Sequence, residues 1–251
     1  MRSRTIVLII WLYAATITGL GQEPMTVPGD QLLLQSLIDR SRAIIPVAQR
    51  IEFISERLLG RRYLTRPLIG SSMAEERLVT RLDGFDCVTF IETVLALTYA
   101  QSPKDFTQRL AAIRYQDARI DWKSRLHYAT QWSAYQIARG LLYDLTTGEE
   151  TLLRSKTLYQ VSGLDQRQVE FRYYPKRTFA RVAPGLQSGD IVFFVSGTAG
   201  LDTNHTGFII RRGDQLLLRS ASRRQRSVTD QPLDDYIRRH PMSGLFVNRP
   251  R

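Results

Sequence analysis

The 251-residue sequence predicts an α+β fold, in which a helical part is followed by a part rich in strands. Apolar residues recur at helical spacing as far as about residue 142. From about Val161, short runs of β-branched and aromatic residues alternate with Gly, Pro, Asp and Ser turns. Helices followed by strands in this way are typical of α+β proteins, and 43% hydrophobic residues are enough for a buried core.

The N-terminus has the pattern of an export signal. Two arginines precede an apolar run over residues 5–20, and small residues come just before Gln22. The run is short and interrupted by polar residues, so a signal that is cleaved is favoured over a retained membrane anchor. We expect residues 1–21 to be the signal and residues 22–251 to be one periplasmic or secreted domain, with a helical N-terminal extension and no stable membrane anchor.

The helical part contains four predicted helices. The first has a stripe that ends before Gly60, the second starts at Cys87, and the third starts after a Ser-Pro-Lys-Asp N-cap sequence. The fourth covers Leu126 to Leu142 and carries an aromatic stripe. The stripe residues are Ile44, Val47, Ile51, Ile54 and Leu58 in the first helix, Phe106, Leu110 and Ile113 in the third, and Tyr128, Trp132 and Tyr135 in the fourth.

The strand-rich part contains five predicted strands, which together suggest an antiparallel sheet. They are Val169–Tyr173, Ile191–Val195, Thr206–Arg211, Gln215–Arg219 and Leu245–Val247.

The net charge of +11 describes a basic protein, and such a surface attracts nucleic acid, anionic lipid or an anionic polymer such as cell wall. Export argues against nucleic acid. The arginines are dispersed apart from one dense patch, and a solvated basic face accounts for most of them. The patch consists of Arg219, Arg223, Arg224 and Arg226.

Cys87 is the only cysteine, and it lies where a turn sequence runs into an apolar, helix-forming stretch. A lone cysteine forms no internal disulfide, and an exposed thiol in an oxidising compartment risks oxidation, which suggests a chemical use. At a helix start, backbone N–H groups and the helix dipole favour the thiolate. The alternative is a small buried hydrophobic residue without chemical function.

Three histidines are candidates for a partner of this cysteine: His127, His205 and His240. His205 is the best placed, because it starts a predicted strand that can face a helix N-terminus. His127 lies beside an aromatic stripe and is either a core or rim residue or part of a cleft. One cysteine and three separated histidines make no metal-binding cluster, so we expect neither a metal nor a cofactor.

Four short segments, taken in order, resemble the NlpC-type, papain-like cell-wall hydrolases. They are Gly60-Arg61-Arg62-Tyr63, Phe85-Asp86-Cys87, Leu186–Phe194 (LQSGDIVFF) and His205-Thr206-Gly207. Each segment alone is a weak signal, but together, around a sole cysteine, they are a strong one.

A closer resemblance is to one branch of these enzymes, formerly a domain of unknown function and now called N-acetylmuramoyl-L-alanine amidase-like. The segment from Phe85 to Leu97 reads FDCVTFIETVLAL, close to the pattern of that branch. Ile113-Arg114-Tyr115 and Arg125-Leu126-His127-Tyr128 match two further motifs, and the resemblance covers roughly residues 45–250. It implies a papain-like core with a central antiparallel sheet and a cleft for peptidoglycan fragments.

The resemblance also implies residue roles. Cys87 would be the nucleophile and His205 the base, while Tyr63, Asp86 and His127 would border or contact the substrate. Tyr63 could equally be a packing residue. The family often has histidine as the third catalytic residue, in the motif His-Ala-Ser, whereas this sequence has Ser220-Ala221-Ser222. A serine hydroxyl accepts a hydrogen bond from imidazole more weakly than a carboxylate does.

The expected function is therefore a cysteine hydrolase that cleaves an amide in peptidoglycan or muropeptides, with the bond between N-acetylmuramic acid and L-alanine as first choice. The γ-D-glutamyl–diaminopimelate bond is the close alternative. A noncatalytic cell-wall-binding protein and a polybasic membrane-surface protein are alternatives of other classes. The sequence does not indicate an oligomeric state.

Overall fold

The computed structural model describes residues 24–26 and 30–251, so the predicted export signal lies outside the described residues. Within the described part, no helix combines the length and the apolar character needed to cross a membrane.

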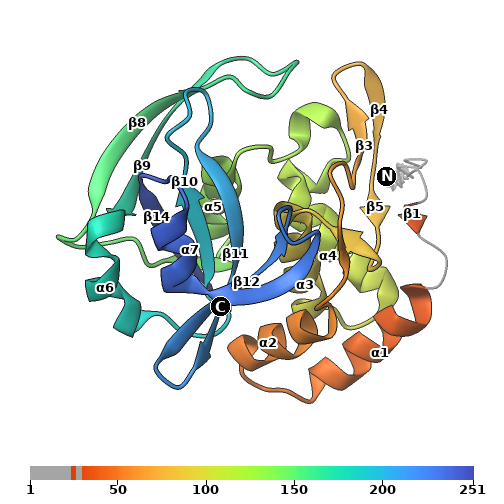
Figure 1. Cartoon of the computed structure of the whole chain (residues 1–251). Helices are drawn as coiled ribbons and strands as arrows, with labels where there is room; N and C mark the ends of the chain where they lie inside the picture. The colour runs from red at the N-terminus through yellow and green to blue at the C-terminus, as the bar shows by residue number, and fades with distance from the viewer. Residues whose placement is uncertain (1–23, 27–29) are drawn as a thin grey trace, which may run out of the picture.

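Seven α-helices occur in the described residues, and most of them come before the main strands (Figure 1). Their bounds are α1 Asp30–Arg42, α2 Val47–Arg57, α3 Cys87–Tyr99, α4 Pro103–Arg114, α5 Ala129–Ala138, α6 Phe179–Val182 and α7 Leu233–Arg239. The N-cap sequence before α4 acts as predicted, because the Ser102 hydroxyl accepts a hydrogen bond from the backbone N–H of Asp105 at 3.1 Å. The helix predicted over residues 126–142 is shorter, since α5 begins only at Ala129 and ends at Ala138.

The strands form one large, mostly antiparallel sheet and two small two-stranded sheets. The large sheet has the order β6-β2-β13-β12-β11-β10-β14-β9-β8, and β7 also pairs with β14. The bounds are β1 Met25–Thr26, β2 Arg62–Tyr63, β3 Ile69–Ser71, β4 Ala74–Arg77, β5 Val79–Thr80, β6 Gly84–Phe85, β7 Leu142–Asp144, β8 Leu152–Leu158, β9 Arg167–Pro175, β10 Ile191–Val195, β11 Thr203–Arg212, β12 Gln215–Ser222, β13 Ser227–Pro232 and β14 Gly244–Pro250. All five predicted strands are present, and the α+β prediction is confirmed.

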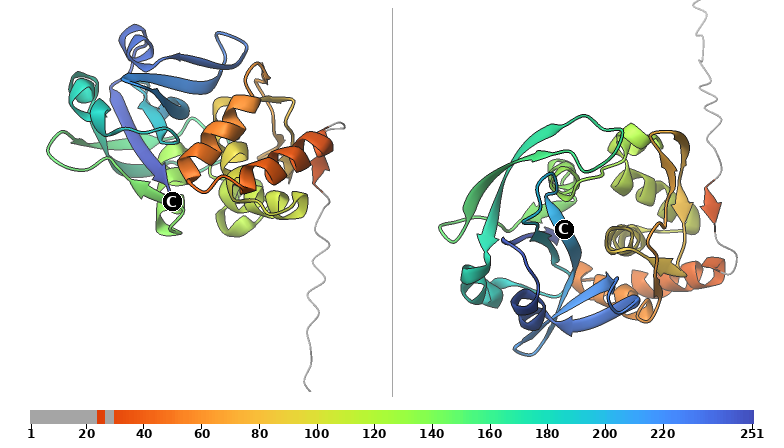
Figure 2. Two further views of the ribbon diagram at one scale, coloured as in Figure 1. Left: turned by 90° about the horizontal axis from the view of Figure 1, so that it is seen from below. Right: turned by 45° about the horizontal axis from the view of Figure 1, so that its top comes forward.

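The sheet has a core on each face. Strand β10 is buried at every position, and its side chains alternate between the two cores as a pleated strand requires. Ile191 and Phe193 join the larger core with α1 to α4, whereas Val192 and Phe194 join a smaller core with α6 and α7. Figure 2 shows helices α1 and α2 on one side of the molecule and the hairpin of β8 and β9 on the other.

Helix α3 lies inside the larger core, which explains why its sequence is apolar on nearly all sides. Phe90, Val94 and Leu95 are fully buried, and the helix contacts β11 and β12 of the sheet. This packing fixes the N-terminus of α3 against β11, and therefore fixes Cys87 near the residues that surround His205.

Candidate active site

Cys87 is the first residue of α3, and its neighbours close the first helical turn. The Asp86 carboxylate accepts a hydrogen bond from the Thr89 backbone N–H at 2.7 Å, and the Thr89 hydroxyl accepts one from the Asp86 backbone N–H at 3.0 Å. This reciprocal capping box satisfies the N–H group of Thr89 and leaves those of Cys87 and Val88 beside the sulfur. Asp86 is therefore the N-cap residue of α3.

The protonation of Cys87 differs from the prediction made for a helix start. Burial, and to a smaller extent the Asp86 carboxylate, raises the pKa of the Cys87 thiol to about 12. Hydrogen bonds from the backbone of Thr206, Cys87 and Val88 lower this pKa, but by less than burial raises it. The expected preformed thiolate is thus wrong for the unliganded protein, because desolvation outweighs the helix N-terminus.

His205 lies on β11, and its imidazole is held by a hydrogen bond and by aromatic neighbours. His205 Nε2 is 2.9 Å from Ser220 Oγ on β12, and Ser220 is fully buried. The imidazole lies parallel to the Phe194 ring at 6.2 Å between ring centroids. Within the described residues Nδ1 makes no hydrogen bond, so it is the ring nitrogen available to exchange a proton. Burial, followed by the charge of His240, lowers the pKa of His205 to about 4, which favours neutral imidazole.

Gly207 explains how Ser220 reaches His205. A Cβ atom at Gly207 would lie 2.8 Å from the Ser220 Cβ and 2.7 Å from the Arg219 carbonyl oxygen. Any other residue would therefore push β12 away from β11. The glycine of the His-Thr-Gly segment is needed for close approach of the two strands, and this approach brings the Ser220 hydroxyl to the imidazole two residues before the glycine.

Tyr63 lies on β2 next to the strand that leads into Cys87. It pairs with Phe85 in parallel register and is partly buried. Burial raises the pKa of Tyr63, and the charges of Cys87 and Asp86 raise it further, which shows that the phenol is within electrostatic range of the sulfur. The structure thus brings Tyr63 together with Cys87 and Asp86.

Tyr236 and His240 also lie near the site, and of the two only His240 was a candidate from the sequence, as one of the three histidines. Burial raises the pKa of Tyr236, with Cys87 as a second cause, and the Tyr236 ring lies 5.5 Å from the His205 ring. On its other side it stacks on His240 at 4.0 Å. Tyr236 lies in α7 and His240 directly follows it, in a segment without a recognisable motif, so no sequence signal could have identified Tyr236.

His127 lies apart from these groups in the described structure. Its Nε2 donates a hydrogen bond to the Trp122 carbonyl oxygen at 2.7 Å, and its ring packs edge to face on the Trp122 ring at 4.3 Å. Burial lowers the pKa of His127 to about 4. The structure therefore groups His127 with Trp122 and not with Cys87, His205 or Ser220.

A buried ion pair lies behind the N-terminal half of α3. Arg114 Nε donates to Glu92 Oε2 at 2.7 Å, and Arg114 NH1 donates to the Val79 carbonyl at 3.0 Å. The neighbouring Tyr115 hydroxyl donates to Glu76 at 2.8 Å, and Arg125 pairs with the same carboxylate at 3.3 Å. The Ile-Arg-Tyr segment and the arginine of Arg-Leu-His-Tyr therefore serve to anchor α3 and the chain beside it.

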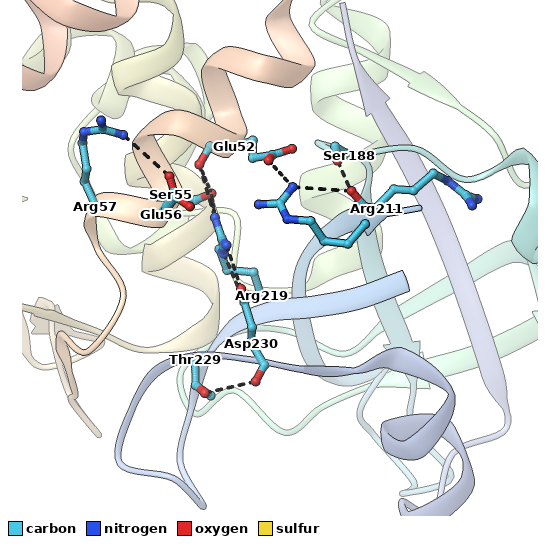
Figure 3. A network of polar contacts seen from close by, with 10 residues as sticks. Glu52, Ser55, Glu56, Arg57, Ser188, Arg211, Arg219, Thr229 and Asp230 are labelled. Carbon is cyan, nitrogen blue, oxygen red and sulfur yellow. Dashed lines mark hydrogen bonds and ion pairs between the residues drawn. The ribbon is translucent and has the colours of Figure 1, made fainter. Parts of the chain in front are cut away.

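A second buried arginine ties the sheet to α2, as Figure 3 shows. Arg219 makes two bonds of 2.7 Å to the Asp230 carboxylate and a third of 3.1 Å to the Ser55 hydroxyl. Because Arg219 precedes Ser220, this network fixes the position of the residue that holds the imidazole. The basic patch predicted at residues 219–226 is therefore divided: Arg219 is buried and paired, and the rest lies in an exposed turn.

The larger hollows of the described surface are lined by other parts of the chain. One of about 1130 Å³ lies between the β3–β4 hairpin and residues 118–123, and one of about 690 Å³ lies between α5 and the β8–β9 hairpin. A smaller hollow of about 370 Å³ reaches the site, because Ser222, Tyr236 and His240 are among its walls. No cluster of three or more His, Cys, Asp or Glu side chains within the described residues has the arrangement to hold a metal ion.

Comparisons with known proteins agree with this architecture. A solved structure of a Legionella pneumophila protein, assigned to a family of unknown function, matches with a TM-score of 0.76 and 22% identity, over 88% of this chain and 94% of that one. A Bacteroides uniformis structure described as an N-acetylmuramoyl-L-alanine amidase matches with a TM-score of 0.72 and 25% identity, over 82% of this chain and 99% of that one.

No curated protein matches the sequence significantly. The model of the N-acetylmuramoyl-L-alanine amidase-like family matches residues 53–245, which include all the residues of the site described above. The chain therefore belongs to the N-acetylmuramoyl-L-alanine amidase-like family.

Proposed function

We propose that the protein is a papain-like cysteine amidase that hydrolyses an amide bond of peptidoglycan or its muropeptide fragments. The observation that carries this proposal is the placement of Cys87 at the start of α3, packed on the strand that carries the Ser220-bonded His205. Family membership supports a peptidoglycan-type substrate. The export pattern at the N-terminus supports action in the periplasm or outside the cell.

The first step adds the Cys87 sulfur to the amide carbonyl, and the thioester forms when the amine leaves in the next step. His205 Nδ1 takes the proton of the Cys87 thiol while the sulfur attacks the amide carbonyl carbon. For Nδ1 to accept this proton, Nε2 must carry the other hydrogen and donate it to Ser220 Oγ, which the 2.9 Å contact allows. Backbone N–H groups at the start of α3 stabilise the negative charge that develops on the carbonyl oxygen.

The second half releases the products and restores the thiol. The imidazolium gives its proton to the amide nitrogen as the carbon–nitrogen bond breaks, and the amine leaves. Water then attacks the thioester, loses a proton to His205, and yields a carboxylic acid and the free thiol after proton return. Both groups begin uncharged, as their burial favours, so the proton must pass directly between them as the sulfur attacks.

Two bonds are candidates for cleavage. The family name supports the bond between N-acetylmuramic acid and L-alanine. The γ-D-glutamyl–diaminopimelate bond is the alternative that comes from the wider NlpC-type resemblance, and no single side chain of the site favours it.

The test is digestion of a defined disaccharide–peptide muropeptide with the purified protein, followed by mass spectrometry of the products. We expect an intact peptide that begins with L-alanine, together with a free disaccharide carrying the lactyl carboxylate. Release of a disaccharide that retains the L-alanyl-D-glutamyl dipeptide would support the alternative bond. An unchanged muropeptide at high protein concentration would contradict the enzyme proposal and favour a noncatalytic binding protein.

A further inference from the structure

The turn between β12 and β13 holds positive charge that the fold does not neutralise. Residues 223–226 read Arg-Arg-Gln-Arg, and all four are exposed. Within the described residues, the side chains of Arg223, Arg224 and Arg226 have no ion pair and no hydrogen bond. Arg219, four residues before Arg223, donates its guanidinium hydrogen bonds to Asp230 and Ser55. The turn therefore differs from the rest of the patch in having guanidinium groups free for a ligand.

The turn lies at the edge of the candidate active site. On one side, Tyr63 N donates a backbone hydrogen bond to the Arg226 carbonyl at 2.8 Å, and Tyr63 lies beside the strand that leads into Cys87. On the other side, the strand that carries Ser220 ends at Ser222 and runs directly into the turn. Arg223 is close enough to the Tyr63 phenol for its charge to lower the pKa of that group. The charge of Cys87 also acts on this phenol, so both Arg223 and Cys87 are within electrostatic range of Tyr63.

Arg224 faces the hollow of about 370 Å³ that also contains Tyr236 and His240. Two carboxylates line this hollow, and both are already engaged within the protein. Asp230 is held by Arg219, and Asp235 by Arg238 and Arg239. The hollow therefore offers a free guanidinium near the reacting groups, and an anionic group of a ligand would meet no unpaired carboxylate there.

We infer that Arg223 and Arg224 bind a carboxylate that the substrate carries within a few bonds of the scissile amide. This inference rests on the proposed function, because the γ-linked D-glutamyl residue of a muropeptide has an α-carboxylate next to either candidate bond. A guanidinium binds a carboxylate through two parallel N–H groups, and a carboxamide lacks both the charge and the second acceptor. The protein should therefore prefer stem peptides with a free D-glutamyl α-carboxylate over those in which it is amidated.

The test uses two muropeptides that differ only in this group, a free α-carboxylate or a carboxamide. Their Kd values are measured by calorimetry on Cys87→Ala protein, which binds the ligand without consuming it. We expect the free acid to bind roughly tenfold tighter or more, as for a charge-assisted hydrogen bond. Arg223→Gln/Arg224→Gln on the same background should remove this preference and leave the affinity for the amidated ligand within about twofold.

Arg177→Gln is the matched control, because Arg177 is also exposed and unpaired within the described residues but lies in the turn before α6. It should leave both affinities unchanged. An equal loss for both ligands in the double variant, or the same loss in Arg177→Gln, would show general attraction of anions and overturn the inference. Equal affinity of the Cys87→Ala protein for the two ligands, or binding of neither, would also overturn it.

Turnover by the otherwise unmodified protein separates this inference from the proposed function. Cleavage of both muropeptides without any preference in binding or rate would leave the function intact and contradict the inference. Preferential binding of the free acid without cleavage of either muropeptide would support the inference and contradict the proposed enzyme.

Discussion

The start of α3 and the strands β11 and β12 build their parts of the site in different ways. At the helix start, the turn that carries Cys87 is capped by residues within three positions, because the Asp86 and Thr89 side chains cap it themselves. On the sheet, His205 and Ser220 are fifteen residues apart and meet only because two strands pair closely at Gly207. A local signal therefore identifies the first region, whereas only the completed sheet creates the second.

The two regions also oppose each other electrostatically. The helix start offers N–H groups that stabilise a thiolate, while the burial of the sulfur disfavours its charged form. Burial has the larger effect and keeps the unliganded thiol protonated. A helix N-terminus alone therefore does not determine the charge of a cysteine, because the solvent exposure of its sulfur depends on the elements packed around it.

The largest effect on activity should follow loss of the imidazole from the sheet. His205→Ala removes the base that accepts the thiol proton, so kcat/KM on muropeptide should fall roughly 10²- to 10⁴-fold. His127→Ala is the comparison variant, because the structure places His127 against Trp122. His127→Ala should lower kcat/KM far less than His205→Ala does. Equal losses in the two variants, measured on folded proteins, would contradict the assignment of His205 as the only basic histidine.

The largest loss of stability should follow disruption of the buried Arg114–Glu92 ion pair that anchors α3. Arg114→Leu leaves the Glu92 carboxylate buried without its partner, which should lower the free energy of unfolding by about 3–5 kcal/mol. Arg181→Leu breaks an exposed pair with Glu150, so it should have little effect on the free energy of unfolding. Urea unfolding followed by circular dichroism measures both. Similar values for the two variants would show that the buried pair does not anchor the helix.

The protonation of Cys87 can be followed by its alkylation with iodoacetamide. A pKa raised to about 12 means that the thiolate fraction grows with pH throughout the neutral and mildly alkaline range. The rate should therefore increase about tenfold per pH unit between pH 7 and pH 10 without a plateau, because the thiolate is the reactive form. If the rate reached a plateau below pH 8, the N–H groups of the helix start would lower the pKa of the thiol by more than burial raises it.

The smallest effect should come from the residue that holds the imidazole. Ser220→Ala removes one neutral hydrogen bond, so turnover should fall about three- to tenfold. Ser222→Ala is the matched control, because the Ser222 hydroxyl accepts a hydrogen bond from the Gln225 backbone within its own turn. Ser222→Ala should leave turnover nearly unchanged. A loss in Ser220→Ala as large as that of His205→Ala would make Ser220 a full member of the catalytic unit.

The sequence predicted the elements that have strong local signals. The Ser102 cap, the helix that starts at Cys87 and the alternating strand Ile191–Val195 are all present, because capping and apolar periodicity determine them. Strand β8, Leu152–Leu158, was not predicted. Most of its residues are exposed, and it is held as a strand by pairing with β9 along its full length, which no pattern in its own residues indicates.

The site residues that lie in strong local motifs were also predictable from the sequence. The residues of the Phe-Asp-Cys and His-Thr-Gly segments could be found from sequence. Tyr236 could not, and His240 was only one of three candidate histidines, because α7 reaches the site only through packing on β12 and β13. The charge of the thiol was predicted wrongly for the same reason. It depends on the desolvation that distant strands impose, whereas the helix start alone suggested a thiolate.

Turnover of a defined muropeptide by Cys87→Ala protein tests directly whether Cys87 is the nucleophile. Cys87 is the first residue of α3 and is not fully buried, so the smaller side chain should leave the fold and its unfolding transition nearly unchanged. The account predicts that cleavage falls to the level of the uncatalysed control, because no other residue of the site can form the thioester. Substantial turnover by the folded variant would contradict Cys87 as the nucleophile.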